Sequence, residues 1–344
     1  MPYNRAMRLL LIRLSALGDV VHTWPLAVAL KALDPAPELT WVVEEPLLPL
    51  VEGHPAVDRA IPTATRRWRQ RLTGRSTRRE LSRLGRALRS PRRDLCLDPQ
   101  GTMKSAAVCR LSRAEHRVGL ARPWRRETLA GLAYTAVVRP AAASPHVVAT
   151  NLELLRAAGG HPPETPTAPD GRWLLGRAAN PLGRAASTSY AVLLPGTGQP
   201  SKIVPAEVLA ETARTLAERG LEPVVAWGPG EKERADRVAE LAGDGTRVAP
   251  PTGLLELAAM LGEAALVVGG DTGPVHLAAS LGTPTVGVFM ATNPLRNGPL
   301  GARVAVVSTA RPPSSQATGS ARAEPGPPPP APKILQTIDR LLGS

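Results

Sequence analysis

The sequence contains few aromatic residues and few cysteines. Only six Trp, three Tyr and one Phe occur among its 344 residues. Proteins that bind single-stranded nucleic acids stack the bases on aromatic side chains, so this composition argues against a single-stranded nucleic-acid partner. Cys96 and Cys109 are the only cysteines, which is too few for a disulfide framework or a zinc site. We therefore expect two ordinary buried thiols.

Long hydrophobic runs are also absent. No apolar run reaches the roughly 18 residues that span a bilayer. Arg13 and Asp19 interrupt the apolar part of the N-terminal segment, which is not the pattern of a signal peptide. These features predict a cytoplasmic protein.

Positive charge is concentrated in one segment. The formal net charge is +13 at pH 7, and residues 59–93 contain thirteen arginines and a single acid, Glu80. Such a segment indicates a polyanionic partner, which could be nucleic acid, an anionic membrane face or an acidic substrate. The alternative is a solvated helix in a chain that uses Arg in place of Lys throughout.

Both halves of the chain alternate apolar runs with amphipathic helices. This alternation is typical of α/β domains with a doubly wound parallel sheet, and the length favours two domains. Ligands of such sheets bind beyond the carboxyl ends of the strands, so we expect the site in a cleft between the halves. The expected parts are an N-terminal domain (1–160), a linker (161–186), a C-terminal domain (187–311), a low-complexity Pro-rich segment (312–332) and a C-terminal helix (333–344).

Three strand-end loops in the second half carry candidate ligands for an anion. The segment "LLPGTGQPSK" brings glycine backbone and the charge of Lys202 together, a combination that suits phosphate. Residues 271–273, Asp-Thr-Gly, open a helix and offer a cap and backbone N–H groups. Glu231 follows "WGPG" at another strand end, where it could bind a ribose. The structural alternatives are a surface turn, a plain N-cap and a favourable first-turn acid.

Together these loops predict a pocket for a nucleotide diphosphate. The sequence contains no D-x-D, so we expect no metal site and no cofactor. Lys202 and helix N-termini would instead neutralise the leaving diphosphate.

Asp19 lies in the first half, where the buried run "RLLLIRL" gives way to a helix. A carboxylate at that point repels phosphates, but it could take a proton from an attacking hydroxyl. The helix N-terminus is expected to keep it ionised. The alternative is that Asp19 only caps the helix.

Seven stretches, taken in order, resemble one enzyme family. They are "SALGDVVHTWP", "WVVEE", "TRRWR", "DPQGTMKSA", "HVVATNLELL", "WGPGEKERA" and "GGDTGPVHLAASLGTPTVGVF". The chain resembles the heptosyltransferases of lipopolysaccharide core synthesis, glycosyltransferase family 9, and within it the heptosyltransferase I group. The resemblance covers about residues 7 to 300. It implies a GT-B fold, with two Rossmann-like domains facing a central cleft, and an inverting transfer of L-glycero-D-manno-heptose from ADP-heptose onto Kdo of the inner core.

The resemblance also implies roles for individual residues. Asp19 is similar to the general base of the family, and Lys202 to its phosphate contact. The implied donor-binding residues are Thr197, Gly198, Lys202, Glu231, Asp271, Thr272, Gly273 and His276, although His276 could serve only in helix packing. The implied acceptor-binding residues are Arg66, Arg67, Arg69, Lys104 and His146.

The expected partners are the ADP-heptose donor, a Kdo-lipid A acceptor and the anionic cytoplasmic face of the inner membrane, with no nucleic acid. Val204 departs from the family, which often has tryptophan at this position, and so does the Pro-rich segment. One alternative is heptosyltransferase II or another family 9 transferase with a different acceptor. A second is a non-catalytic basic binding module, against which the presence of both Asp19 and Lys202 argues.

Overall fold

The computed structural model describes residues 6–70, 74–141, 146–183, 189–311 and 323–343, except for the side chains of Arg66, Arg69 and Gln70. Contacts divide the chain into two compact units, Met1–Thr167 and Ala168–Ser344. The boundary falls inside the predicted linker of residues 161–186. About half of the predicted low-complexity segment, residues 312–322, lies outside the described residues.

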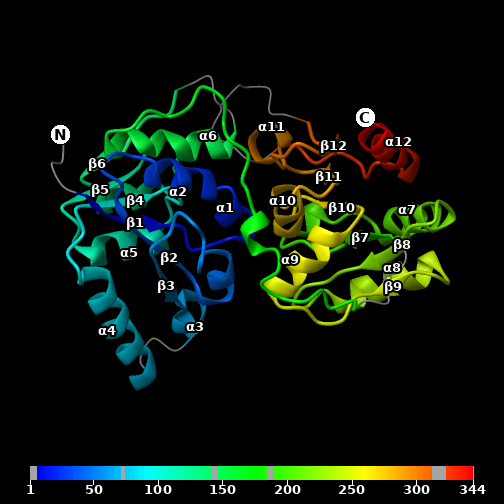
Figure 1. Cartoon of the computed structure of the whole chain (residues 1–344), viewed down its shortest axis with the longest axis horizontal. Helices are drawn as coiled ribbons and strands as arrows, with labels where there is room; N and C mark the ends of the chain where they lie inside the picture. Colours follow the sequence, from blue (N-terminus) through cyan, green and yellow to red (C-terminus); the bar gives the residue numbers. More distant parts are fainter. Residues whose placement is uncertain (1–5, 71–73, 142–145, 184–188, 312–322, 344) are drawn as a thin grey trace. The chain divides into compact units, whose positions relative to one another are not determined.

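The N-terminal unit is built on a sheet of six parallel strands in the order β3-β2-β1-β4-β5-β6 (Figure 1). Four of the five residues of β1 are buried, because a central parallel strand is covered on both faces. The strands are β1 (Arg8–Ile12), β2 (Glu38–Glu44), β3 (Arg59–Thr63), β4 (Leu95–Asp98), β5 (His116–Leu120) and β6 (Ala136–Val138).

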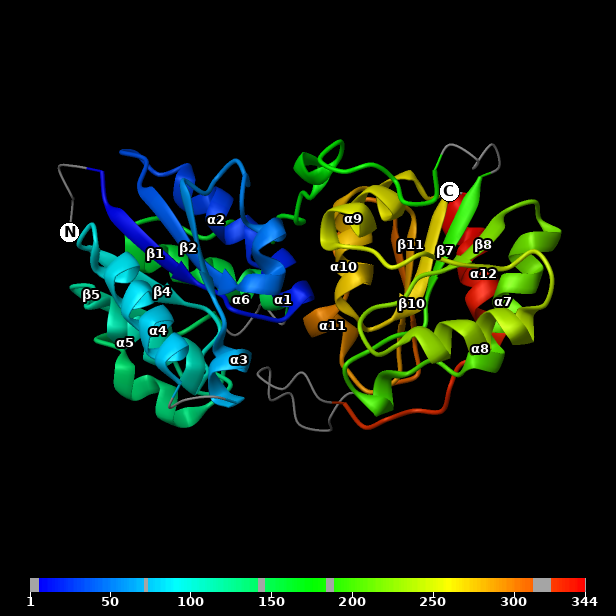
Figure 2. The same ribbon diagram turned by 90° about the horizontal axis from the view of Figure 1, so that it is seen from below.

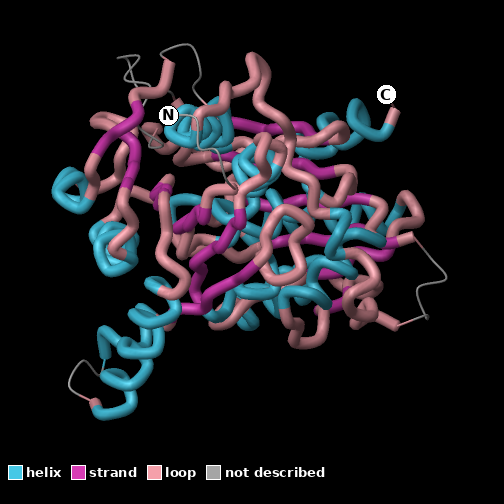
Figure 3. Tube along the Cα trace, turned by 60° about the vertical axis from the view of Figure 1, so that its left-hand side comes forward, coloured by secondary structure: helices cyan, strands magenta, loops and turns pink. Residues whose placement is uncertain are grey.

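Helices cover both faces of this sheet. Helices α2 and α6 pack together on one face, and α4 and α5 pack together on the other (Figure 2). Helix α4 extends away from the rest of the unit (Figure 3). The helices are α1 (Leu17–Val21), α2 (Trp24–Lys31), η1 (Glu45–Leu50), α3 (Thr65–Gln70), α4 (Arg75–Arg89), α5 (Met103–Ser112), η2 (Thr128–Ala133), α6 (Val147–Leu152) and η3 (Glu153–Ala158).

The C-terminal unit repeats this topology. Its six parallel strands lie in the order β12-β11-β10-β7-β8-β9, which is the order of the first sheet when each unit is numbered from its own first strand. The strands are β7 (Tyr190–Leu194), β8 (Glu222–Val225), β9 (Arg247–Val248), β10 (Leu266–Gly270), β11 (Thr285–Phe289) and β12 (Val304–Ser308).

Helices α7, α8 and α12 cover one face of the second sheet, and α9 and α10 cover the other (Figure 2). Ile334 and Ile338 of α12 lie one turn apart and are fully buried in the core beneath α7. The helices are η4 (Arg172–Leu174), η5 (Pro200–Lys202), α7 (Ala206–Glu218), α8 (Lys232–Ala242), α9 (Leu254–Glu263), α10 (Gly273–Ser280), α11 (Pro294–Asn297) and α12 (Ala331–Leu342).

The predicted α/β fold with doubly wound parallel sheets is confirmed in both units. Strands β6 and β12 were not predicted, and both are edge strands whose residues are mostly exposed or half-buried. In each unit the strand order reverses between the two central strands, β1 and β4 or β7 and β10. This switch point is where open α/β sheets bind ligands.

Candidate active site

Asp19 lies in α1, the first helix after β1, at the switch point of the first sheet. The backbone N–H of Ala16 donates to Asp19 Oδ2 over 3.1 Å. Arg126 reaches the same carboxylate from a loop before η2, and its Nη2 donates to Oδ1 at 3.2 Å and Oδ2 at 2.9 Å. The Asp19 side chain is therefore held by one backbone group and one cation.

Two arginines set the charge state of Asp19. Burial raises the pKa of its carboxyl group, but the charges of Arg13 and Arg126, with the hydrogen bond from Ala16, bring the pKa below its ordinary value. Asp19 is thus ionised at neutral pH, as a general base must be. The sequence predicted that the helix N-terminus keeps Asp19 ionised, and the structure adds the charges of Arg13 and Arg126 to the hydrogen bond from the N-cap residue Ala16.

Arg13 is buried and holds the surroundings of Asp19 together. Its Nε donates to Thr23 Oγ1 at 3.1 Å, and its Nη2 donates to the carbonyl of Pro99 at 3.1 Å and to Asn151 Oδ1 at 3.2 Å. These bonds join the residue that follows β1 to the loop after β4 and to α6. This role was not predicted, although a charged residue in an apolar strand is a visible signal.

The predicted acceptor residues outside the arginine-rich segment differ in environment. His146 is buried as the N-cap of α6, where its Nδ1 accepts from the N–H of Val148 at 3.2 Å, and its ring forms a T-shaped pair with that of His22. Lys104 is half-buried in the first turn of α5 and makes no ion pair or hydrogen bond with the residues that the structure describes.

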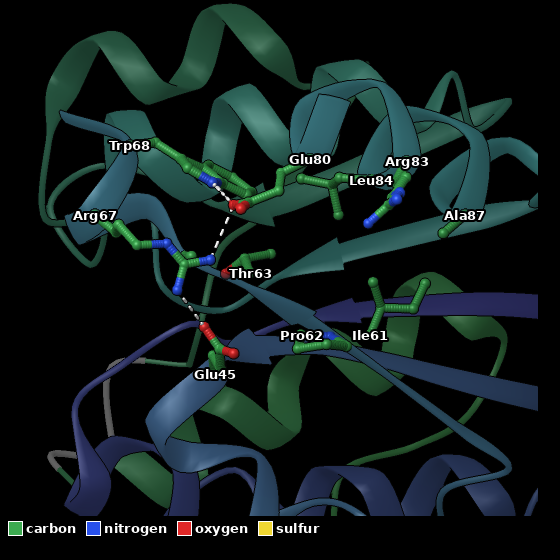
Figure 4. A pocket seen from close by; sticks show the side chains of 11 residues that line it. Glu45, Ile61, Pro62, Thr63, Arg67, Trp68, Glu80, Arg83, Leu84 and Ala87 are labelled. Atoms are coloured by element: carbon green, nitrogen blue, oxygen red, sulfur yellow. Dashed lines mark hydrogen bonds and ion pairs between the residues drawn. The ribbon is translucent and has the colours of Figure 1, made fainter. Parts of the chain in front are cut away.

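In the arginine-rich segment, Arg67 bridges two carboxylates. Its Nη1 lies 3.0 Å from Glu45 Oε2 and its Nη2 lies 2.9 Å from Glu80 Oε2 (Figure 4). The backbone of Arg66 and Arg69 lies in α3, but their side chains lie outside the described residues.

A cavity of about 260 Å3 adjoins the Asp19 loop within the N-terminal unit. Ser15, Ala16 and Leu17 form one wall, and Arg67 and residues 44–47 form the other. Ala16 is also the residue whose N–H holds Asp19. The cavity can therefore hold a polar group close to the proposed base.

At the switch point of the second sheet, Lys202 and Asp271 form an ion pair. Lys202 Nζ donates to Asp271 Oδ2 at 2.7 Å, and Thr292 Oγ1 donates to the same oxygen at 2.6 Å. His276 Nε2 lies 3.5 Å from Asp271 Oδ1. The structure thus brings three of the predicted donor-binding residues together, from the loops after β7 and β10 and from α10.

Neighbouring groups lower the pKa of Asp271 by more than burial raises it. Burial raises the pKa of its carboxyl group, while the hydrogen bond from His276 and the charge of Lys202 bring the pKa well below its ordinary value. An ammonium has three N–H donors, and Asp271 accepts one from Lys202. The remaining donors suit a diphosphate.

Thr272 is the N-cap of α10 and Gly273 is its first residue. The sequence predicted several backbone donors here, but Pro274 at the second position has no N–H. Thr272 and Gly273 therefore supply the donors at this end of the helix, where the helix dipole favours an anion.

Glu231 lies against the glycine-rich loop that leads to Lys202. Its Oε2 accepts from the N–H of Gly228 at 2.9 Å. A Cβ atom on Gly196 would lie 1.9 Å from the same oxygen, so only glycine permits this contact. Thr197 is half-buried and Gly198 is exposed in the same loop. The structure thus brings the predicted ribose ligand and the predicted phosphate loop together.

Three further findings concern metal binding, membrane spans and thiols in the residues that the structure describes. No group of three or more His, Cys, Asp or Glu side chains there could hold a metal ion. No helix in the same residues combines the length and apolar character of a membrane span. Cys96 and Cys109 are free and buried, as the sequence predicted.

Comparison with known proteins agrees with this geometry. Residues 81–324 match the family described as glycosyltransferase family 9 (heptosyltransferase). The chain belongs to glycosyltransferase family 9. It is therefore a glycosyltransferase, as the sequence predicted, and the alternative of a non-catalytic binding module is set aside.

Two curated relatives match most of the chain. Lipopolysaccharide heptosyltransferase 1 of Pseudomonas aeruginosa is 36% identical over 302 residues, which cover 86% of this chain and 82% of the relative. The Escherichia coli protein of the same name is 34% identical over 292 residues, which cover 84% and 89% respectively.

Solved structures show the same relationship. The E. coli heptosyltransferase WaaC with ADP has a TM-score of 0.80 and 30% identity, covering 97% of this chain and all of that one. WaaC with ADP-2-deoxy-2-fluoro heptose has a TM-score of 0.77. The fold of this family 9 chain is GT-B, as predicted.

Proposed function

We propose that this family 9 enzyme transfers L-glycero-D-manno-heptose from ADP-heptose to Kdo of the lipopolysaccharide inner core. The relatives named lipopolysaccharide heptosyltransferase 1 and the WaaC structures with ADP and a fluorinated ADP-heptose support this donor and pathway. The observation that carries the proposal is the pair of switch-point sites, with an ionised carboxylate in one unit and a lysine–aspartate pair in the other.

Asp19 acts as the base in this proposal. It takes the proton from an acceptor hydroxyl, and the oxygen attacks the anomeric carbon of the heptose as ADP leaves. One displacement of this kind inverts the configuration at that carbon. A positioned base of this sort contributes about 10²- to 10⁴-fold to rate.

Lys202 and the N-terminus of α10 stabilise the departing diphosphate. Asp271 fixes the Lys202 ammonium by the 2.7 Å bond, so the charge is in place before the phosphate charge develops. Together with the absence of D-x-D from the sequence, this arrangement supports a metal-independent mechanism.

The base and the diphosphate ligands belong to different units. In the proposed reaction, both units must therefore engage one pair of substrates at the same time. In this proposal the two units close around the substrates, which aligns the reacting groups and excludes water.

The arginines of α4 suit peripheral binding to the cytoplasmic face of the inner membrane. Arg75, Arg79 and Arg86 are exposed on α4, and each basic residue near an anionic membrane contributes about 1 kcal/mol. Such binding would hold the enzyme at the surface where a lipid-linked acceptor is found.

The test is ADP release from ADP-heptose with Kdo2-lipid A, with and without EDTA. The proposal predicts release that depends on the acceptor and persists in EDTA. Turnover only with an acceptor that already carries a heptose would instead identify a later transferase of the pathway. Loss of turnover in EDTA, restored by a divalent cation, would refute the metal-independent mechanism.

A further inference from the structure

A second cavity in the N-terminal unit lies between β3 and α4 and has a volume of about 410 Å3 (Figure 4). Ligand pockets commonly have volumes of about 300–1,000 Å3. Ile61 and Pro62 of β3 form one apolar wall, and Leu84 and Ala87 of α4 form the other. The space is large enough and apolar enough for part of an organic ligand.

Glu80, the acid of the arginine-rich segment, is already engaged at one side of this cavity. Its Oε2 accepts from Trp68 Nε1 at 2.6 Å and from Arg67 Nη2 at 2.9 Å. These two bonds, led by that from Trp68, lower the pKa of Glu80. The hydrogen bonds to this carboxylate thus come from Arg67 and Trp68, and the charge of Arg83 also acts on it.

Arg83 supplies a positive charge to the same cavity. Its guanidinium points into the space between α4 and β3 (Figure 4). Within the described residues, no hydrogen bond or ion pair engages this exposed side chain, but its charge acts on Glu80 of the same cavity. A guanidinium beside apolar walls fits an amphiphile that carries a phosphate or carboxylate, because the planar donor fork pairs with those groups.

The cavity adjoins the one beside Asp19. Both are lined by Glu45, Ala64 and Arg67, and the smaller cavity extends to Ala16, whose N–H holds Asp19. A molecule in the smaller cavity therefore lies next to the cavity that Arg83 lines, with Arg67 at the boundary of the two.

We propose that the cavity between β3 and α4 binds the phosphorylated, acylated part of the glycolipid acceptor. A phosphate pairs with Arg83, and apolar groups lie against Ile61 and Leu84. The acceptor sugar occupies the smaller cavity near Asp19. This inference rests on the proposed function, which makes the acceptor an anionic glycolipid.

The experiment compares two acceptors in neutral detergent micelles, Kdo2-lipid A and the soluble Kdo disaccharide without lipid A. The variants are Arg83→Ala, which removes the charge, and Ala87→Phe, which fills the cavity. Arg110→Ala is the matched control, because Arg110 is exposed on α5 of the same unit and does not line the cavity.

We expect Arg83→Ala to raise the KM for Kdo2-lipid A about tenfold, the loss expected for one charge-assisted hydrogen bond. Ala87→Phe should act in the same direction. Neither variant should alter the KM for the disaccharide or for ADP-heptose, and Arg110→Ala should alter none of the KM values. Unchanged KM values, or equal increases for both acceptors, would overturn the inference.

Two further outcomes are informative. The first tells whether the cavity binds a membrane phospholipid or the acceptor, and the second separates failure of the inference from failure of the proposed function. If Arg83→Ala and Ala87→Phe lose binding to phosphatidylglycerol vesicles and keep their KM for Kdo2-lipid A, the cavity binds a membrane phospholipid and the inference is wrong. If the wild type uses neither acceptor, the proposed function has failed. Direct binding of Kdo2-lipid A to the wild type and to Arg83→Ala then still decides the inference, since equal affinities would overturn it.

Discussion

Both units place an ion pair at the switch point of a six-stranded parallel sheet, but the pairs differ in which partner is accessible. In the N-terminal unit, the Asp19 side chain is 16% exposed and its partner Arg126 is 57% exposed. In the C-terminal unit, Lys202 is 17% exposed and Asp271 is 8% exposed. Arg126 can leave Asp19 at little cost, whereas the buried Lys202–Asp271 pair is fixed.

This difference matches the chemistry that we propose for each unit. A general base must give up its partner or share it with the substrate, so an exposed arginine on Asp19 is suitable. A ligand for developing phosphate charge acts best when it is already in position, so a buried pair is suitable. The same topology thus supports a carboxylate whose cationic partner can move away in one unit and a rigid ion pair in the other.

The largest expected effect comes from removing the base. Asp19→Asn should lower kcat by about 10²- to 10⁴-fold and leave the melting temperature almost unchanged. The assay is acceptor-dependent ADP release. Asp236→Asn is the control, since Asp236 is an exposed carboxylate that pairs with Lys232 of its own helix. Near-normal turnover in Asp19→Asn would exclude Asp19 as the base.

A smaller loss is expected from the C-terminal pair. Lys202→Met removes a donor to the diphosphate, and loss of one such group costs about 10²- to 10³-fold in kcat. Lys232→Met is the matched control, because Lys232 is exposed on α8 and paired with Asp236. Equal activity of the two variants would show that Lys202 does not stabilise the leaving group.

The sequence could predict the residues that follow strands, and it could not predict their partners. Asp19, Lys202 and Asp271 lie in the segments that follow β1, β7 and β10, where local pattern identifies both the strand and the turn. The partner of Asp19 is 107 residues away, in a loop with no periodic signal. Only the folded sheet brings Arg126 to Asp19.

The arginine-rich segment shows the same limit of prediction from sequence. Its charge is visible in the sequence, and it predicts an anionic partner for the segment as a whole. The structure distinguishes Arg67, which is held by Glu45 and Glu80, from Arg83, which points into a cavity. That distinction depends on the packing of α4 against β3, and composition cannot report it.

A more moderate effect is expected from Arg126→Ala. Losing this cation raises the pKa of Asp19, whose folded-state value is lowered by Arg13 and Arg126. The base then becomes protonated at a higher pH, so the acid limb of the kcat profile should shift upward. We expect activity to fall about tenfold on that limb and to recover as pH rises. An unchanged acid limb would show that Arg126 does not tune Asp19.

The smallest expected effect concerns the membrane. Arg79→Ala removes one exposed charge from α4 and should weaken binding to phosphatidylglycerol vesicles about fivefold, corresponding to about 1 kcal/mol. ADP-heptose binding should not change. Arg237→Ala is the control, because Arg237 is exposed in the other unit and paired with Glu240. Equal losses in both variants would indicate a general effect of net charge.

The most direct test of the division between the units is the affinity of ADP-heptose for Asp19→Asn and Lys202→Met, measured by titration calorimetry without acceptor. We predict that Asp19→Asn binds the donor with the affinity of the wild type, although it does not turn over. We predict that Lys202→Met binds it at least tenfold more weakly, the loss of about one charge-assisted hydrogen bond. Weakened donor binding in Asp19→Asn, with normal binding in Lys202→Met, would contradict the assignment of the base to the first unit and the diphosphate site to the second.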